Sequence, residues 1–288
     1  MMRSLLRLLC LISILIFAGV VLAQGDEDTV PYIQLSAFNT PLLEGWENQS
    51  EDDFAQFHYA EAHATIRSAL VEIGDPVAAA RSDLRRAFGI ELGEAIYQDK
   101  VNLADGTWNV LVYEPDAVAS ASVMARRAGS QSVVISFVES DPEARILMLT
   151  IAQSGDARED AAAEIDLALS LLASNKPADL VETSALALPS GEWTRAGGAG
   201  AVGMGMVFGN DSFLAIGEGE TGNLPKLADA YNRTVLGFFI TPDNAGYLAL
   251  ALTASFAILA LLILSFFWRS RNIQKDLELI ESLNQAGD

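Results

Sequence analysis

The chain has 288 residues, 51% of them hydrophobic, and its 38 acidic residues outnumber 18 basic ones, giving a formal net charge of −20. A surface this acidic repels phosphate backbones and anionic lipid head groups, so nucleic acid is an unfavourable partner, while cations and basic proteins are favoured. The only cysteine is Cys10, so the rest of the chain forms no disulfide and depends on a packed core for stability.

The first 23 residues have the pattern of a signal peptide. Arg3 and Arg7 flank the start of an apolar run from Leu5 to Leu22, which ends in the small-x-small pattern that a signal peptidase accepts before Gln24. We therefore assign 1–23 as a signal peptide and 24–40 as an N-terminal spacer. The alternative is an uncleaved anchor, which leaves the following region on the same side of the membrane.

Residues 41–175 are predicted to form one α+β domain. Asp75 and Pro76 provide an N-cap and a first helical residue, so we expect a helix that runs to about Phe88 and stops at Gly89. Alternating apolar runs separated by turn signals predict strands at 54–59, 64–73, 95–103, 108–113, 119–126, 132–138 and 145–152. Apolar residues at helical spacing predict a second helix at 157–172, with Asp156 as its cap.

Residues 176–244 repeat this style in a shorter α+β block that ends in a helix predicted at 224–239. The segment from Val101 to Trp108 resembles that from Ala185 to Trp193, because each has an apolar strand, a turn, and a Trp two residues after a Gly. The block is either packed on the first domain or continuous with it. Duplication explains the resemblance, and so does convergent use of the same turn.

The fold class predicted from this order of elements is α+β, with antiparallel sheet and helices packed on it. Residues 41–172 resemble the PsbP/Mog1-type α/β/α sandwich, on the strength of Leu42-Leu43-Glu44-Gly45-Trp46, the helix that begins at Asp75, and the Gly106-Thr107-Trp108 strand. The resemblance implies a binding or assembly module. It transfers no site residue, because no catalytic motif defines that group.

The segment 245–268 is predicted to be a transmembrane helix. Its apolar part from Tyr247 to Trp268, at about 1.5 Å per residue, spans roughly 33 Å, enough to cross a bilayer core of about 30 Å. Arg269 and Arg271 follow directly, and basic residues stay on the cytoplasmic side. We therefore expect a cytoplasmic tail at 269–288, an extracytoplasmic acidic domain, and anchoring by Tyr247, Trp268, Arg269 and Arg271.

The segment from Gly198 to Gly203 formally matches the G-x-G-x-x-G pattern of dinucleotide-binding loops. That pattern requires a following helix, whose N-terminus holds the pyrophosphate. Here the sequence continues as a strand from Met204 to Phe208 that enters a hairpin. We therefore expect no nucleotide and no other cofactor, and interpret the glycines as a turn or as close strand packing.

Other candidates for chemistry are weak. His58 and His63, the only histidines, are five residues apart, which places them on one face of neither a helix nor a strand, so a metal site needs a turn between them. Motifs for nucleophilic catalysis are absent, and the many carboxylates single out no glycosidase pair. Trp46, Trp108 and Trp193 follow glycines and are more typical of a core than of a sugar platform.

The sequence favours a single-pass protein of the cell membrane with a non-enzymatic acidic ectodomain that binds a protein partner or basic ligand, or serves as an accessory. One alternative is an exported hydrolase that acts on glycans or peptides through carboxylates, and another is a passive structural envelope component. A pocket that contains His58 and converging carboxylates favours the hydrolase. A filled sheet core favours the binding module.

Overall fold

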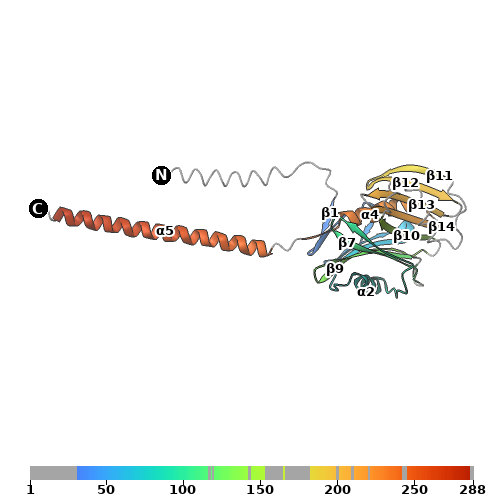
Figure 1. The fold of residues 1–288 in the computed structure, drawn as a ribbon, viewed down its shortest axis with the longest axis horizontal. Helices are drawn as coiled ribbons and strands as arrows, with labels where there is room; N and C mark the ends of the chain where they lie inside the picture. Colours follow the sequence, from blue (N-terminus) through green and yellow to red (C-terminus); the bar gives the residue numbers. More distant parts are fainter. Residues whose placement is uncertain are drawn as a thin grey trace. The chain divides into compact units, whose positions relative to one another are not determined.

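The alternating apolar runs of the sequence form three antiparallel sheets in the computed structural model of this chain (Figure 1). The structure describes residues 31–115, 118, 120–141, 144–152, 165, 182–198, 201–208, 211–219, 221–241 and 245–285. The predicted signal peptide, and all of the helix predicted at 157–172 except Ile165, lie outside the described residues. The predicted α+β class with antiparallel sheets and packed helices is confirmed.

Seven strands make the first sheet, in the order β3-β4-β5-β9-β8-β7-β6. Their bounds are Glu47–Asn48 (β3), Phe54–Tyr59 (β4), Ala64–Val71 (β5), Tyr97–Leu103 (β6), Gly106–Tyr113 (β7), Ser120–Ala128 (β8) and Gln131–Glu139 (β9). A 3-10 turn, η1 (Ala60–Ala62), joins β4 to β5. The six strands predicted between 54 and 138 are confirmed, with ends that differ by about two residues or fewer.

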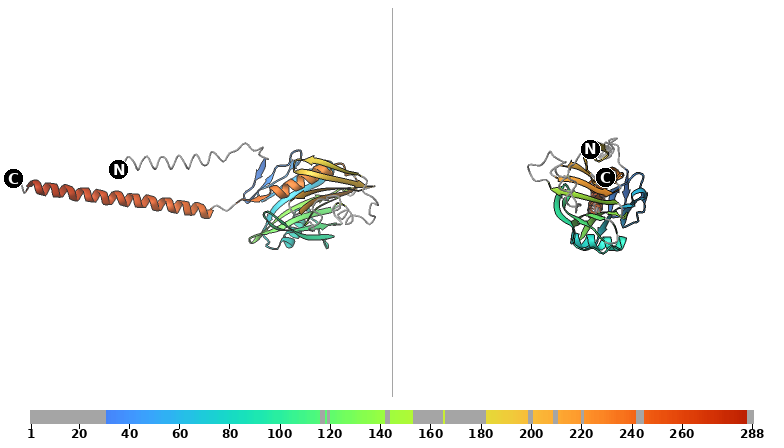
Figure 2. Two further views of the ribbon diagram at one scale, coloured as in Figure 1. Left: turned by 45° about the horizontal axis from the view of Figure 1, so that its top comes forward. Right: turned by 90° about the vertical axis from the view of Figure 1, so that its right-hand side faces the viewer.

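Helix α2 (Pro76–Phe88) begins and ends where the sequence predicts. The carboxylate of Asp75 accepts an N-cap hydrogen bond from the backbone N–H of Ala78 at 2.7 Å. Gly89 ends the helix with φ of 67°, a conformation that favours glycine. Leu84 and small residues of α2 pack on β8 and β9, so the helix covers the outer face of the first sheet (Figure 2).

Five strands make the second sheet, in the order β10-β14-β13-β12-β11. Their bounds are Ala144–Ala152 (β10), Glu182–Leu188 (β11), Gly191–Gly198 (β12), Ala201–Phe208 (β13) and Asp211–Gly219 (β14). The domain boundary expected at 175/176 does not divide the fold. Strand β10 pairs with β14, and the described residues up to Ile240 form one compact unit, so the block after residue 175 continues the first.

The inner faces of the two sheets enclose the main core. The first sheet contributes Trp108, Met124 and Phe137, and the second contributes Trp193 and Met204. Helix α4 (Leu224–Gly237), most of whose residues are buried, completes this core and contacts strands of both sheets. The core is therefore a filled layer between two sheets, with α2 outside the first of them.

Side chains of the first sheet cap the outer edge of β10. Ser120 of β8 donates a hydrogen bond from Oγ to the carbonyl oxygen of Ile146, and Ser122 Oγ accepts one from the backbone N–H of Met148 at 2.9 Å. Unpaired backbone groups on an edge strand invite pairing with another chain. Because the serines bond two of these groups and lie against the edge, they hinder such pairing along β10.

The two large sheets repeat one topology. In each, the first strand pairs with the fifth, and the remaining strands follow as a meander, β5-β9-β8-β7-β6 and β10-β14-β13-β12-β11. Helix α2 lies in the chain between β5 and β6, and the helical residue Ile165 lies between β10 and β11. We call residues 64–139 the first half and 144–219 the second half.

Residues at equivalent positions support the duplication interpretation. Trp108 lies opposite Val101 and Trp193 opposite Leu186, and each Trp stands two residues after a Gly with positive φ. The indole N–H of each Trp donates to the side chain three residues earlier. Further buried pairs share register and a constant offset in the chain: Ile66 and Ile146, Met124 and Met204, Ser132 and Ser212.

A third, small sheet joins the two ends of the folded unit. It contains β1 (Tyr32–Gln34), β2 (Phe38–Pro41) and β15 (Phe239–Ile240), with β2 in the middle. Phe38 is fully buried, and its ring lies 4.8 Å from that of Phe238. The spacer expected at 24–40 is therefore wrong for residues 32–40, because an apolar residue there belongs to the core.

The second unit begins at Thr241 and contains one helix, α5 (Ala245–Gln285). Within its stretch from Leu250 to Glu278, an 18-residue window has a mean hydropathy of 2.5 and buries none of its side chains within the protein, and the helix is long and apolar enough to span a membrane. Apolar side chains exposed along a helix require a non-aqueous environment or a partner. The helix continues without a break through the expected tail as far as Gln285.

Candidate functional site

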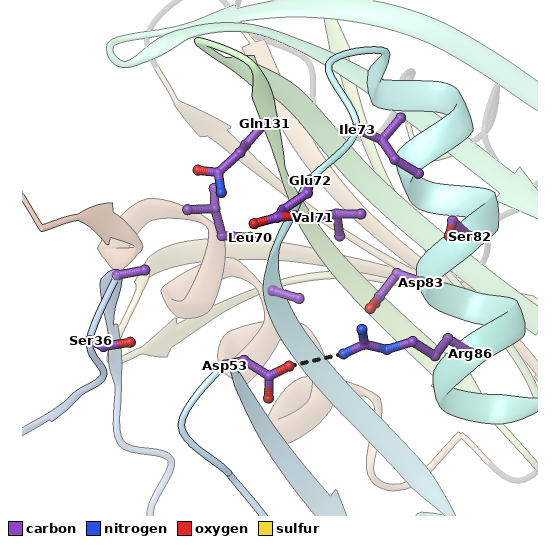
Figure 3. A pocket seen from close by; sticks show the side chains of 12 residues that line it. Ser36, Asp53, Leu70, Val71, Glu72, Ile73, Ser82, Asp83, Arg86 and Gln131 are labelled. Carbon is purple, nitrogen blue, oxygen red and sulfur yellow. Dashed lines mark hydrogen bonds and ion pairs between the residues drawn. The ribbon is translucent and has the colours of Figure 1, made fainter.

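A cavity of about 460 Å³ opens at the end of β5, beside α2 (Figure 3). Apolar residues of the strand form its floor, and polar residues form its rim. The residues that line it are Ser36, Ala37, Asp53, Ala69, Leu70, Val71, Glu72, Ile73, Ser82, Asp83, Arg86 and Gln131. We call it the β5 cavity.

The cavity exists because β5 is longer than the strand that pairs with it on one side. Pairing with β4 stops at Phe54 and Ala69, whereas pairing with β9 continues to Val71 and Ser132. Among the described strands, none pairs with residues 70–71 on the β4 side. The backbone of Leu70 therefore faces the β4 side of the cavity without a strand partner, as in a site for an extended peptide.

Beneath the cavity, Arg67 of β5 and Asp83 of α2 form a buried ion pair, each side chain only 3% exposed. Arg67 Nε and Nη2 donate to the carboxylate of Asp83 at 3.1 and 3.2 Å, and its guanidinium carbon lies 3.8 Å from the ring centroid of Phe54. Nη1 donates to Gln56 Oε1 at 3.4 Å. Both charges are thus neutralised by each other, and the pair fixes α2 to the sheet.

A second ion pair crosses the rim. Arg86 Nη2 donates to Asp53 Oδ2 at 3.0 Å, with side chains 68% and 64% exposed (Figure 3). An exposed pair of this kind contributes little to stability, about 0–1 kcal/mol. Glu72, also at the rim, is exposed and makes no ion pair with a described residue. The rim therefore has one unpaired negative charge and one pair that a ligand can displace at low cost.

The two histidines lie apart from this cavity. A ring nitrogen of His58 is hydrogen bonded to Thr65 Oγ1 across the β4–β5 pair at 3.2 Å. His63 ends η1 in a left-handed conformation with φ of 49°. Within the described residues, no group of three His, Cys, Asp or Glu side chains gathers to hold a metal ion. The structure therefore adds no ligands to the weak metal candidates His58 and His63.

The glycine-rich segment lies at the β12–β13 hairpin, and a strand follows it. This confirms the expected strand at Met204–Phe208, which pairs with β14. A Cβ atom on Gly203 would lie 2.2 Å from Ile165 Cγ2, and one on Gly205 would lie 3.3 Å from Ile165 Cγ1. These glycines therefore let a helical residue approach the sheet closely, and no helix N-terminus follows them to bind a phosphate.

The tryptophans of the meanders are core residues. Trp108 is fully buried and Trp193 nearly so, which confirms the core interpretation and removes them as a sugar platform. Trp46 packs against Tyr59 with ring centroids 5.2 Å apart, and Lys226 Nζ lies 4.1 Å from the Tyr59 ring centroid. Lys226 also donates to the Tyr59 hydroxyl at 3.0 Å, and that hydroxyl donates to Glu61. This surface cluster uses its polar groups internally.

Sequence reasoning missed a buried carboxyl group, Glu139 at the end of β9. Its side chain is fully buried, Oε1 accepts the backbone N–H of Asp141 at 2.9 Å, and Oε2 has no partner. Burial raises the pKa of Glu139 to about 7, because the interior disfavours the charged form. The sequence signal is a Glu that continues the apolar run from Val133 to Val138.

Comparison of the sequence with models of known protein families and with curated proteins gives no match.

Proposed function

We propose that this chain is a single-pass membrane protein whose acidic folded unit lies outside the cytoplasm and binds a basic, extended peptide segment in the β5 cavity. Helix α5 supports the anchor, and Arg269 and Arg271 after Trp268 support the orientation. The carrying observation is the combination of open strand backbone with the unpaired carboxylate of Glu72. Backbone pairing supplies affinity, and the carboxylate selects a Lys or Arg.

Binding without catalysis follows from how the other cavity carboxylates are used. A glycosidase needs one carboxyl group that keeps a proton and a second that is ionised and free to act. Asp83 is held by Arg67, and Asp53 is held by Arg86. Both carboxylates are thus engaged in ion pairs, so neither is free to take one of these two roles. His58 is not among the lining residues.

A photoreactive amino acid in the intact chain tests this proposal in the native membrane. Placed at Gln131, in the cavity wall, it should capture a discrete partner, and the capture should fall when Glu72→Gln is added. Gln98, exposed on β6, is the matched control position. If the chain is a passive envelope component, photocrosslinking gives no product at Gln131 or the same products at Gln131 and Gln98. Either result overturns the proposal.

The orientation is tested separately. Protease added to intact cells or spheroplasts should digest the acidic unit and leave a fragment that contains the C-terminal tail. A protected acidic unit contradicts the orientation, whatever the photocapture result.

A further inference from the structure

Each outermost strand of a sheet in the described part of the chain is protected, except one. Edge strand β3 has only two residues, β10 is capped by Ser120 and Ser122, and β6 carries exposed Asp99 and Lys100. Short strands, covering groups and charges are the usual means by which proteins prevent edge-to-edge pairing. The strands at the edges of the small sheet are also very short.

The exception is β11, the outermost strand of the second sheet (Figure 1). It has seven residues in unbroken register with β12, from Glu182 opposite Gly197 to Leu188 opposite Gly191, so no bulge interrupts it. Residues 183–188 include no charged residue and no proline. Its counterpart in the first half is β6, which has charged residues at its centre, whereas the one charged residue of β11 is Glu182 at its first position.

The free edge of β11 has a definite set of backbone groups. In a hairpin with a two-residue turn, the closing pair, here Leu188 and Gly191, is a hydrogen-bonded pair, and such pairs alternate along the ladder. Residues 184, 186 and 188 therefore bond to β12. Residues 183, 185 and 187 direct their N–H and C=O groups outward, and the side chains of Ala185 and Ala187 are exposed and small.

We propose that β11 pairs antiparallel with β11 of a second copy of this chain, about a two-fold axis at Ala185. This register sets 185 opposite 185 and 183 opposite 187 of the second copy, so that all three outward residues are used on both strands. Such a symmetric contact closes on itself and forms a dimer. It also joins two strongly acidic molecules along a strip without charge, where repulsion is weakest. This proposal does not depend on a ligand in the β5 cavity.

Disulfide trapping in the full-length membrane protein tests the pairing and its register. In a Cys10→Ala background no other thiol is present, so Ala185→Cys should form a cross-linked dimer on mild oxidation, since paired residues have Cα atoms about 5.5 Å apart. Ala187→Cys lies about 13 Å from its symmetry mate in this register and should cross-link poorly. Lys100→Cys, at the centre of β6, is the matched control on the other edge strand.

The size of the full chain in detergent micelles gives a second measurement. Wild-type protein should sediment as a dimer, and Ala185→Lys should halve the protein mass, because two lysines then face each other across the axis. Far-ultraviolet circular dichroism of this variant should be unchanged, since Ala185 is exposed. A monomeric wild type, a dimer that survives Ala185→Lys, or equal cross-linking at Ala185→Cys and Lys100→Cys each overturns the proposal.

Discussion

The two halves of the folded unit follow the same path but stabilise it with different chemistry. At equivalent ladder positions, the first half has Arg67 beside Ser136, and the second half has Leu147 beside Ile216. The first pair belongs to a polar interface with α2, and the second to an apolar cluster that includes Ile165. The topology thus depends on strand order and register, and it tolerates a change from ionic to apolar contacts. The cavity and its charges occur beside the ionic interface.

The largest expected effect comes from breaking the buried ion pair. Arg67→Ala leaves the carboxylate of Asp83 buried without a counter-charge, so the free energy of unfolding should fall by about 3–5 kcal/mol. The double variant Arg67→Leu, Asp83→Leu imitates the apolar second half and should recover most of that loss. Urea denaturation of the full chain in detergent micelles measures both. A single variant that costs under about 1 kcal/mol would show that the ion pair does not fix α2.

Glu139 gives a pH-dependent difference between the halves, since Gly219 occupies the equivalent position. Its pKa is about 7 in the folded chain against 4.5 for the ordinary group, so between these values the folded state binds more protons than the unfolded state. The free energy of unfolding is therefore at its highest with respect to this group below pH 4.5. It falls as the pH rises from 4.5 to 7, and above pH 7 it stays at the lower value.

Glu139→Gln should remove this slope. The variant should gain up to about 3 kcal/mol over wild type at pH 8 and nothing at pH 4. Urea denaturation across this pH range measures the gain, with Glu72→Gln, at an exposed position, as the control. A gain that does not depend on pH would assign the effect to packing instead.

The third prediction concerns close packing in the second half. Gly203 stands where the first half has Val123, and its missing side chain makes room for Ile165. Gly203→Ala should cost about 1–3 kcal/mol by overpacking, and adding Ile165→Val should return part of it. Gly222→Ala, where a Cβ meets nothing within 4 Å, should change stability little. If the two glycine variants have equal midpoints in urea, Ile165 does not require the glycine.

The smallest effect should come from the rim of the β5 cavity. Arg86→Ala removes only an exposed ion pair, so the free energy of unfolding should change by less than about 1 kcal/mol. The same denaturation series, read beside Arg67→Ala, separates the two arginines of this region. A loss comparable to that of Arg67→Ala would mean that Arg86 holds the helix in place.

Local signals predicted the elements well. Asp75, Pro76 and Gly89 set the bounds of α2, and turn residues set the strands of the meander, because caps and turns act over a few residues. The pairing of strands that are far apart in the sequence was harder to predict. Nothing near β10 shows that its partner is β14, about sixty residues later, so the sequence left open whether the block after residue 175 packs on the first or continues it. Phe38 belongs to the core only because β2 meets β15, which lies near the other end of the folded unit.

The candidate site could not be predicted from the sequence for the same reason. Asp53, Glu72 and Arg86 are unremarkable charges in an acidic sequence, and they gather at one cavity because β4 stops short of the end of β5. Arg67 gave a weak signal, since it is the one charged residue in the strand from Ala64 to Val71. Glu139 gave a similar one. His58 and His63 attracted notice by rarity alone.

The pairing of β2 with β15 also decides how the fold meets mechanical load. Any tension along the chain from residue 241 onward enters the folded unit at Ile240, and β15 is held to β2 by a ladder of two residues. The contact of Phe38 with Phe238 lies directly behind that ladder. Under a pull from α5 this short strand should therefore detach first, followed by α4, while the two large sheets remain closed on each other.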